Sequence, residues 1–189
     1  EDCGLAENTI IVVYSDHGME FFEHETWGQG NSAVGDFSPR VPLLIRDPRL
    51  PPRGLVHEVM RSIDLAPTLL ELIGARTATN MDGVSLAACL AQQRVCPTLD
   101  AYSETGIWLA NIPGLPENHL RYPDLMELLE VPDYKSGTLS IKTQYRDLIH
   151  KAKDRMIRHG PWKLVWQPLA DGCRILLFNV EEDPGCIHN

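Results

Sequence analysis

Asp16 and His17 are the residues whose types and spacing best suit chemistry, and Gly18 follows them directly. Aspartate supplies a hard anionic oxygen and neutral histidine a nitrogen, so the pair could hold part of the shell of a divalent cation. Two adjacent residues cannot complete such a shell, and the other ligands would have to come from elsewhere. The structural alternative is an aspartate that caps a turn beside an exposed, merely polar histidine. Three residues alone leave both interpretations open.

Residues 9–14 form the element expected to position this pair. The run is apolar without alternation and rich in β-branched residues. Such a pattern is typical of a strand covered on both faces, as in a parallel α/β sheet. Ligands of open α/β sheets collect beyond the carboxyl ends of the strands, which is where Asp16 and His17 would lie. Gly18 is expected to let the chain turn away sharply, and residues 40–46 predict a second short buried strand.

A loop rich in glycine and aromatic residues, residues 19–36, follows the pair. Loops beside a site often carry binding residues, and the polar His24 and Gln29 are the best candidates for contacts. The aromatic residues of the loop have two open interpretations. They could take part in binding, or they could plug a small satellite core; they are Phe21, Phe22 and Trp27.

The composition indicates one ordinary globular domain. The chain has 189 residues, of which 43% are hydrophobic and 23% charged. A formal net charge of -9 argues against a nucleic-acid partner. No apolar run approaches the roughly 20 residues of a membrane span. If the substrate is anionic, a metal ion or a local cationic group must reverse the field at the site.

The five cysteines form neither a Cys-X-X-Cys motif nor a Cys/His zinc spacing, so a structural zinc site is not expected. Cys89 and Cys96 could close a short loop if the compartment is oxidising. Buried, inert thiols are the favoured interpretation.

The remaining elements follow local patterns. Residues 64–73 predict a helix with Asp64 as N-cap and Gly74 beyond its end, and residues 84–91 a second short helix. Near the end of the chain, tight turns at residues 159–161 and 170–172 predict an antiparallel meander. Its strands are expected at residues 155–158, 162–166 and 174–179.

We therefore expect three parts in the chain. They are the carboxyl-terminal part of an α/β domain at residues 1–96, a loop-rich connection at residues 97–140, and a small antiparallel β subdomain at residues 141–189. Glu104 and His119, in the middle part, could face a cleft. Solvated loop residues are the favoured interpretation of both.

The order of several motifs resembles the carboxyl-terminal portion of a sulfatase of the alkaline phosphatase superfamily. The motifs are Ser-Asp-His-Gly, Glu-His-Glu-Thr-Trp-Gly, Arg-Val-Pro-Leu-Leu-Ile, Ile-Asp-Leu-Ala-Pro-Thr-Leu-Leu, Asp-Gly-Val-Ser-Leu, Trp-Lys-Leu and Asp-Pro-Gly. The resemblance implies an α/β fold, namely part of an alkaline-phosphatase-like α/β sandwich followed by a small antiparallel β subdomain with a helix. It also implies a metal-dependent sulfuric ester hydrolase.

The resemblance assigns roles to four residues. Asp16 and His17 match two ligands of the catalytic divalent ion, which is commonly calcium in sulfatases and manganese or zinc in related hydrolases. His24 falls near the substrate pocket, with a catalytic role toward the anion or the leaving group. Gln29 stands where the family often has a lysine that touches the sulfate, and this departure removes a positive charge from the substrate-binding position.

Two features of the family are missing from this sequence. The Cys/Ser-X-Pro-X-Arg motif of the nucleophile, whose cysteine becomes formylglycine, does not occur. The further acidic pair that the family has near its amino terminus is also missing, since the sequence contains no Asp-Asp. We therefore expect a carboxyl-terminal fragment that is inactive alone and whose partner is the missing amino-terminal part of the same protein. Its two front strands would lie exposed or pair between chains in a homodimer.

The substrate implied is a small anionic sulfate or phosphate ester. One alternative within the superfamily is a phosphoester or phosphonate hydrolase, or a phosphoglycerol-type transferase. An alternative from another class is a metal-free binding or interaction module that keeps the scaffold.

Overall fold

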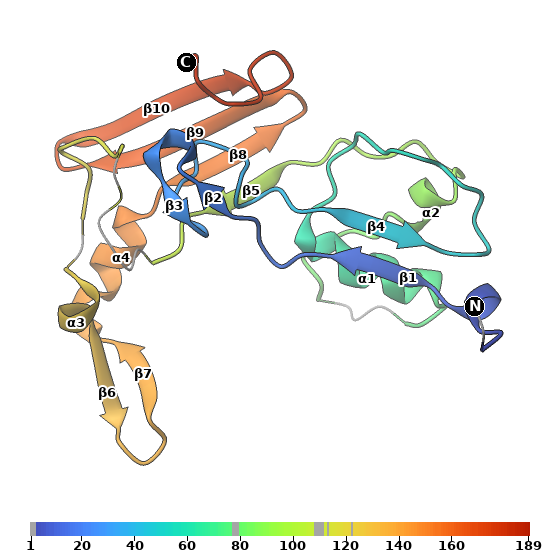
Figure 1. The fold of residues 1–189 in the computed structure, drawn as a ribbon, viewed down its shortest axis with the longest axis horizontal. Coiled ribbons are helices and arrows are strands. Elements are labelled where there is room, and N and C mark those ends of the chain that lie inside the picture. Colours follow the sequence, from blue (N-terminus) through green and yellow to red (C-terminus); the bar gives the residue numbers. More distant parts are fainter. Residues whose placement is uncertain (1–2, 77–79, 108–111, 113, 122) are drawn as a thin grey trace. The chain divides into compact units, whose positions relative to one another are not determined.

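The structure is a computed structural model of the chain, and it describes residues 3–76, 80–107, 112, 114–121 and 123–189 (Figure 1). The chain forms two compact units. The first unit comprises residues 1–15 and 42–101, and the second comprises residues 16–41 and 102–189. The three-part division expected from the sequence stays a prediction about domain boundaries.

The first unit contains a two-stranded antiparallel sheet. Strand β1 (Ile11–Tyr14), which follows the short 3-10 helix η1 (Ala6–Asn8), pairs with β4 (Leu43–Arg46). The expected parallel, doubly covered strand is therefore wrong for this chain: side chains of both strands are exposed, with Val13 at 55% and Leu44 at 60%. A two-stranded ribbon has too few neighbours to cover both faces. The expectation that these strands lie exposed or pair between chains in a homodimer stays a prediction.

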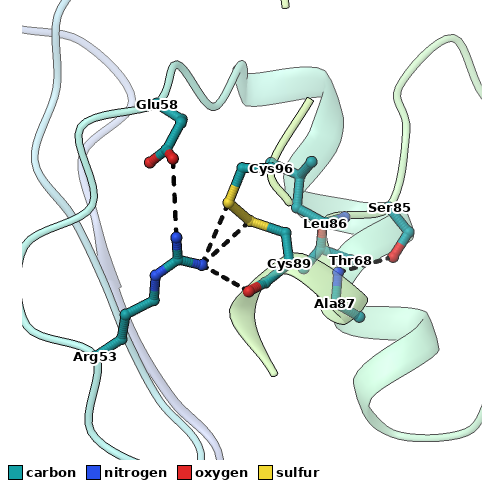
Figure 2. The surroundings of a disulfide bond; sticks show 8 residues. All are labelled: Arg53, Glu58, Thr68, Ser85, Leu86, Ala87, Cys89 and Cys96. Carbon is teal, nitrogen blue, oxygen red and sulfur yellow. Dashed lines mark hydrogen bonds and ion pairs between the residues drawn. A yellow bond between two sulfur atoms is a disulfide. The ribbon is translucent and has the colours of Figure 1, made fainter. Parts of the chain in front are cut away.

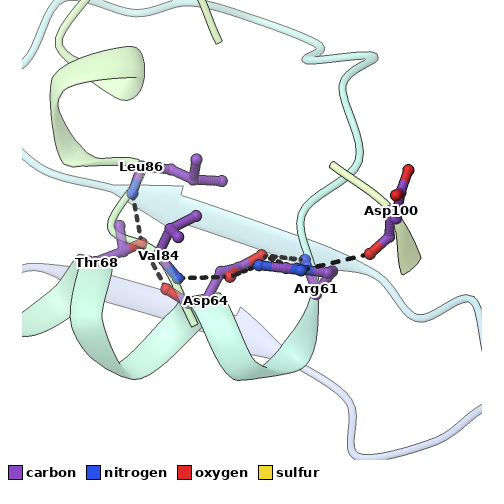
Figure 3. Close-up of polar contacts among 6 residues, drawn as sticks. All are labelled: Arg61, Asp64, Thr68, Val84, Leu86 and Asp100. Carbon is purple, nitrogen blue, oxygen red and sulfur yellow. Dashed lines mark hydrogen bonds and ion pairs between the residues drawn. The ribbon is translucent and has the colours of Figure 1, made fainter. Parts of the chain in front are cut away.

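Helix α1 (Ser62–Leu72) begins two residues before Asp64. The prediction of Asp64 as N-cap is wrong because its carboxylate acts from the third helical position. Its Oδ2 accepts a hydrogen bond from the backbone nitrogen of Arg61 at 3.0 Å (Figure 3). An acidic third residue that reaches back in this way satisfies an amide that the helix itself cannot. Gly74 ends the helix with φ +69, as expected.

Helix α2 (Ala87–Leu90) carries one half of a disulfide bond. Cys89 and Cys96 are joined with their Cα atoms 4.9 Å apart, so the oxidised alternative is confirmed and inert thiols are wrong for this pair (Figure 2). Arg53 Nη1 donates to the Cys89 carbonyl at 2.6 Å. Of the other cysteines, Cys186 is buried, whereas Cys3 and Cys173 are exposed.

The second unit is built on a four-stranded sheet with the order β10-β9-β8-β5. Its strands are β5 (Ala101–Glu104), β8 (Arg155–His159), β9 (Trp162–Leu169) and β10 (Gly172–Asn179). The last three form the predicted antiparallel meander, with His159 opposite Trp162 and Leu169 opposite Gly172. Strand β5 was not predicted, because its partner β8 lies far along the sequence.

The core of the second unit lies against this sheet. Its buried members are Ala33, Met156, Val165, Leu176, Phe178, Val180 and Cys186. Ala33 belongs to the loop that follows the candidate metal ligands, so the sheet and that loop share one core. The loop is therefore anchored by packing of its own residues.

The segment between the two expected domains contains regular structure. Helix α3 (Leu125–Leu128) leads into a hairpin of β6 (Leu129–Asp133) and β7 (Thr138–Ile141). The two strands of this hairpin were not predicted from the sequence. The 3-10 helix η3 (Thr143–Tyr145) and helix α4 (Arg146–Ala152) then lead to β8. None of the helices in the described ranges is long and apolar enough to cross a membrane.

Candidate functional site

Asp16 and His17 lie in the segment that follows β1. The backbone nitrogen of His17 donates to Asp16 Oδ1 at 3.0 Å, and His17 Nδ1 lies 2.9 Å from the carbonyl oxygen of Gly18. A carbonyl oxygen can only accept, so Nδ1 carries the proton of the neutral ring. The lone pair is then on Nε2, which lies 3.7 Å from Asp16 Oδ1.

This geometry fits two ligands of one divalent cation. Two atoms that are each about 2.0–2.6 Å from one ion can lie no more than about 5 Å apart, and the observed separation of Oδ1 and Nε2 is 3.7 Å. The contact from Nδ1 to a backbone carbonyl is the outer-shell contact that orients metal-binding histidines. The side chains are 84% exposed for Asp16 and 43% exposed for His17, so a solute can reach both.

The pair supplies only part of a coordination shell. Among the residues that the structure describes, no group of three or more His, Cys, Asp or Glu side chains is arranged to hold a metal ion. This agrees with the chemistry of an adjacent Asp-His pair, which leaves several positions of a divalent ion to other ligands.

Gly18 is needed for a different reason from the one expected. Its φ is not in the left-handed region, so the sharp turn does not depend on glycine there. Instead, a Cβ atom on Gly18 would lie 2.0 Å from the carbonyl oxygen of Phe37. The Gly18 nitrogen also donates to the Ser38 carbonyl at 2.8 Å. The absence of a side chain thus lets the backbone at Gly18 lie directly against residues 37–38.

The loop with His24 is a small strained hairpin. Strand β2 (Glu20–Phe21) pairs with β3 (Trp27–Gly28), and the 3-10 helix η2 (Glu23–Glu25) lies between them. Three of its residues have left-handed backbones, with φ of 75 at Phe22, 51 at His24 and 60 at Glu25. Each such residue costs on the order of 1–3 kcal/mol, and such strain is concentrated at functional sites.

His24 is half-buried, and its ring is held by the end of the chain. Its Nε2 lies 2.6 Å from the carbonyl oxygen of Gly185, and its ring centroid lies 5.9 Å from that of Phe37. The hydrogen bond is thus to the backbone of the Asp-Pro-Gly turn, 161 positions further along the sequence. Nothing in the local sequence around His24 could have predicted this partner.

Gln29 is exposed between two left-handed glycines, Gly28 with φ 104 and Gly30 with φ 68. The Gly30 nitrogen donates to Ser38 Oγ at 2.8 Å, and the Gly30 carbonyl accepts from the Gly106 nitrogen at 2.9 Å. The backbone beside Gln29 is therefore fixed, while its side chain is presented to solvent. This suits a residue that contacts a ligand.

The three aromatic residues of the loop do not plug a satellite core. Phe21, Phe22 and Trp27 are 62%, 70% and 55% exposed. They pack on one another, with Trp27 centroid distances of 5.7 Å to Phe21 and 5.0 Å to Phe22.

A buried polar network that the sequence did not indicate lies in the second unit. His119 Nε2 is 2.6 Å from Asp154 Oδ1, and both side chains are fully buried. Gln167 Nε2 donates to the other carboxylate oxygen at 2.8 Å. The expectation of a solvated His119 is therefore wrong, because its partner lies 35 positions away. Glu104 instead bonds to Lys153 Nζ at 2.5 Å, and this contact holds the pKa of the Glu104 carboxyl below its usual value.

The sulfatase family model matches residues 1–75, the segment that contains Asp16, His17, His24 and Gln29. Over this segment the chain is similar to sulfatases. Similar curated proteins are an extracellular sulfatase SULF-1 homolog of Drosophila melanogaster, 38% identical over 90 residues, and arylsulfatase K of Xenopus laevis, 34% identical over 104 residues. These matches cover 48% and 53% of this chain, which spans 8% and 19% of the two relatives.

The fold of this chain is similar to that of solved structures of a sulfatase and of a phosphonate monoester hydrolase. A solved structure of a phosphonate monoester hydrolase from Silicibacter pomeroyi matches with a TM-score of 0.63 at 24% identity. The match covers 97% of this chain and 32% of that protein. The α/β fold class expected from the sequence is confirmed, although the sheet at the front is antiparallel.

Proposed function

We propose that Asp16 and His17 supply two ligands to the divalent cation of a sulfuric ester hydrolase, in a protein of which this chain is a part. The observation that carries the proposal is the 3.7 Å separation of Asp16 Oδ1 and His17 Nε2 within the segment that matches the sulfatase family. The names of the relatives, an extracellular sulfatase homolog and an arylsulfatase, support sulfate esters as the substrate class.

Calcium is the proposed ion because the resemblance to sulfatases implies it, and the carboxylate oxygen of Asp16 suits it. Manganese and zinc are the alternatives, and zinc suits the imidazole nitrogen of His17. When bound, a divalent cation would offset the negative charge of the ester oxygens. This matters because the chain carries a formal net charge of -9 and would otherwise repel an anionic substrate. The nucleophile, formylglycine in this family, is proposed to lie outside this chain.

His24 is proposed to act at the substrate anion or at the leaving group. Its Nε2 is 2.6 Å from the Gly185 carbonyl, so that nitrogen is occupied as a donor. The ring can therefore meet the ester only through Nδ1. In the protonated ring this atom would donate a hydrogen bond or a proton, and in the neutral ring it would accept one.

We expect Asp16→Ala and His17→Ala each to remove metal-dependent hydrolysis of a chromogenic sulfate ester by the full-length protein, because each variant deletes one ligand. Bound metal and turnover are measured together, and Glu182→Ala, an exposed carboxylate in the second unit, is the control. Parent-level metal content and turnover in both ligand variants would refute the assignment. The 189-residue chain alone is expected to show no turnover above background.

Gln29→Lys is expected to increase kcat/KM for a sulfate ester in the full-length protein. A cationic side chain at this exposed position would add a charge-assisted hydrogen bond to the anion, worth about 1.5–3 kcal/mol, or about 10- to 150-fold. Gln29→Met, which has similar length but no charge, is the matched control. A clear loss of activity in the lysine variant would mean that the pocket is built for a different substrate.

A phosphoester or phosphonate ester hydrolase is the second candidate. Gln29 stands where a sulfatase would be expected to have a cation, so this position does not identify a sulfate ester as the substrate. The solved phosphonate monoester hydrolase supports the second candidate. Assays with chromogenic sulfate, phosphate and phosphonate esters of the same alcohol separate the two. A metal-free interaction module would show neither hydrolysis nor specific metal binding.

A further inference from the structure

We propose that the turn at residues 183–186 is a positioning element for the site, because its Gly185 carbonyl holds His24 through Nε2 and so presents Nδ1 to the substrate. The role of Nδ1 rests on the proposed function. The anchoring of the loop by the turn does not, and it can be measured on the chain itself.

The first step is the direction of the hydrogen bond. Nε2 of His24 lies 2.6 Å from the Gly185 oxygen, and a carbonyl can only accept. Nε2 must then carry a proton in either charge state of the ring. No other residue in the described part of the chain forms a hydrogen bond with the His24 side chain. One ring nitrogen is thus fixed to the protein and the other remains for a ligand.

The second step is that the turn holds its own carbonyl in place. Asp183 Oδ2 accepts from the backbone nitrogens of Ile187 at 2.6 Å and His188 at 2.7 Å. The Cys186 nitrogen donates to the Asp183 carbonyl at 3.0 Å. The Cys186 side chain, in a residue that is 2% exposed, packs into the core of the second unit with Phe178. Gly185 therefore lies between a carboxylate-capped turn and a buried anchor.

The third step is that the loop needs such an anchor. Phe22, His24 and Glu25 are all left-handed, and the backbone hydrogen bonds among residues 22–26 are all local. Two of them are Phe22 N to the Thr26 carbonyl at 2.8 Å and Thr26 N to the Glu23 carbonyl at 3.0 Å. Strained conformations persist only where surrounding structure fixes them. The bond from His24 to Gly185 is a long-range contact that meets this need.

The test compares two replacements of His24 in the 189-residue chain. The amide nitrogen of glutamine can take the position of Nε2, whereas the shorter asparagine reaches only the position of Nδ1. We expect His24→Gln to keep the hydrogen-exchange protection of the Thr26 amide within about twofold of the parent, and His24→Asn to lower it at least tenfold. Equal protection in the two variants would overturn the proposal.

A second arm acts on the turn. Asp183→Ala removes the acceptor of two backbone amides. We expect the parent to show a slowly exchanging Nε2–H resonance of His24 and this variant to lose it. The protection of the Thr26 amide should also fall at least tenfold. Glu182→Ala, at the exposed neighbouring position, should change neither. An unchanged Nε2–H resonance in Asp183→Ala would contradict the proposal. If that variant does not fold, the two His24 variants decide the question.

The anchor and the proposed function fail in different ways. In the full-length protein His24→Gln should keep the loop ordered yet lose ester hydrolysis, because it lacks a titratable Nδ1. If the protection of the Thr26 amide follows the expected pattern but the parent protein hydrolyses no ester, the proposed hydrolase is refuted and the anchor is not. If neither His24→Asn nor Asp183→Ala lowers the protection of the Thr26 amide, the anchor is refuted whatever the activity.

Discussion

Asp36→Ala is expected to destabilise the second unit by about 3–5 kcal/mol, the usual cost of leaving a buried charge without its partner. Lys163 has a fully buried side chain, and its Nζ donates to Asp36 Oδ1 at 2.8 Å and to the Gly35 carbonyl at 2.7 Å. Arg158 Nη1 contacts the other oxygen of Asp36 at 3.0 Å. Removal of the carboxylate would leave the buried ammonium beside a second cation.

Urea denaturation followed by tryptophan fluorescence measures this loss of stability, since Trp162 and Trp166 lie in the same strand, β9, as Lys163. The double variant Asp36→Ala/Lys163→Met is expected to recover part of the stability, because it removes the stranded charge together with its partner. Glu182→Ala should change stability by less than about 0.5 kcal/mol. A loss of stability below about 1 kcal/mol in Asp36→Ala would show that the contacts of Asp36 with Lys163 and Arg158 do not fix residues 35–36 to the sheet.

Asp64→Asn is expected to destabilise the first unit by about 3 kcal/mol at neutral pH, the lower end of the range for a buried pair because Arg61 is partly exposed. The carboxylate is fully buried and accepts from Arg61 Nη2 at 2.8 Å and from the Val84 nitrogen at 2.9 Å (Figure 3). The asparagine amide would carry no charge to pair with Arg61. Its NH2 group, which can only donate, would also face either the Arg61 guanidinium or the Val84 amide.

This effect should depend on pH in a defined direction. Burial alone would raise the pKa of Asp64, but the hydrogen bonds from the Arg61 side chain and from the Val84 and Arg61 amides outweigh it, and the pKa lies below the usual value. A group whose pKa is lower in the folded state stabilises above its unfolded pKa of about 3.9. That stability is lost as the pH falls through the folded value.

The difference between parent and Asp64→Asn should therefore be constant above about pH 5 and shrink below about pH 4. Urea denaturation followed by the NMR signals of the Val84 and Leu86 amides reports on this unit, and Asp82→Asn, at an exposed site, is the control. A difference of the same size at pH 6 and pH 3 would contradict the assigned role of the carboxylate.

Local patterns predicted the elements that short-range interactions decide. The meander followed from turns at Gly160 and Gly172, and the end of α1 followed from Gly74, because each depends on residues that are adjacent in the chain. The antiparallel pairing of β1 with β4 and the addition of β5 to the sheet depend on distant segments, and the sequence indicated neither.

The candidate site divides in the same way. The residue types and order identified Asp16 and His17 as metal-competent, but only the structure gives the 3.7 Å separation and the Nδ1 contact that set the ring. The exposure of Gln29 could not be read from its neighbours. The partners of His24 and His119 lie 161 and 35 positions away, which no local pattern encodes.

Paramagnetic NMR of the 189-residue chain with Mn²⁺ tests the central claim most directly, because relaxation by the ion detects even weak binding by an incomplete set of ligands. At substoichiometric Mn²⁺, the account predicts that the amide signals of Ser15, His17 and Gly18 broaden first. Asp16→Ala and His17→Ala should each abolish this broadening, calcium should compete with it, and Glu182→Ala should leave it unchanged. Broadening that begins elsewhere, or that persists at these signals in both ligand variants, would contradict the assignment of Asp16 and His17 as metal ligands.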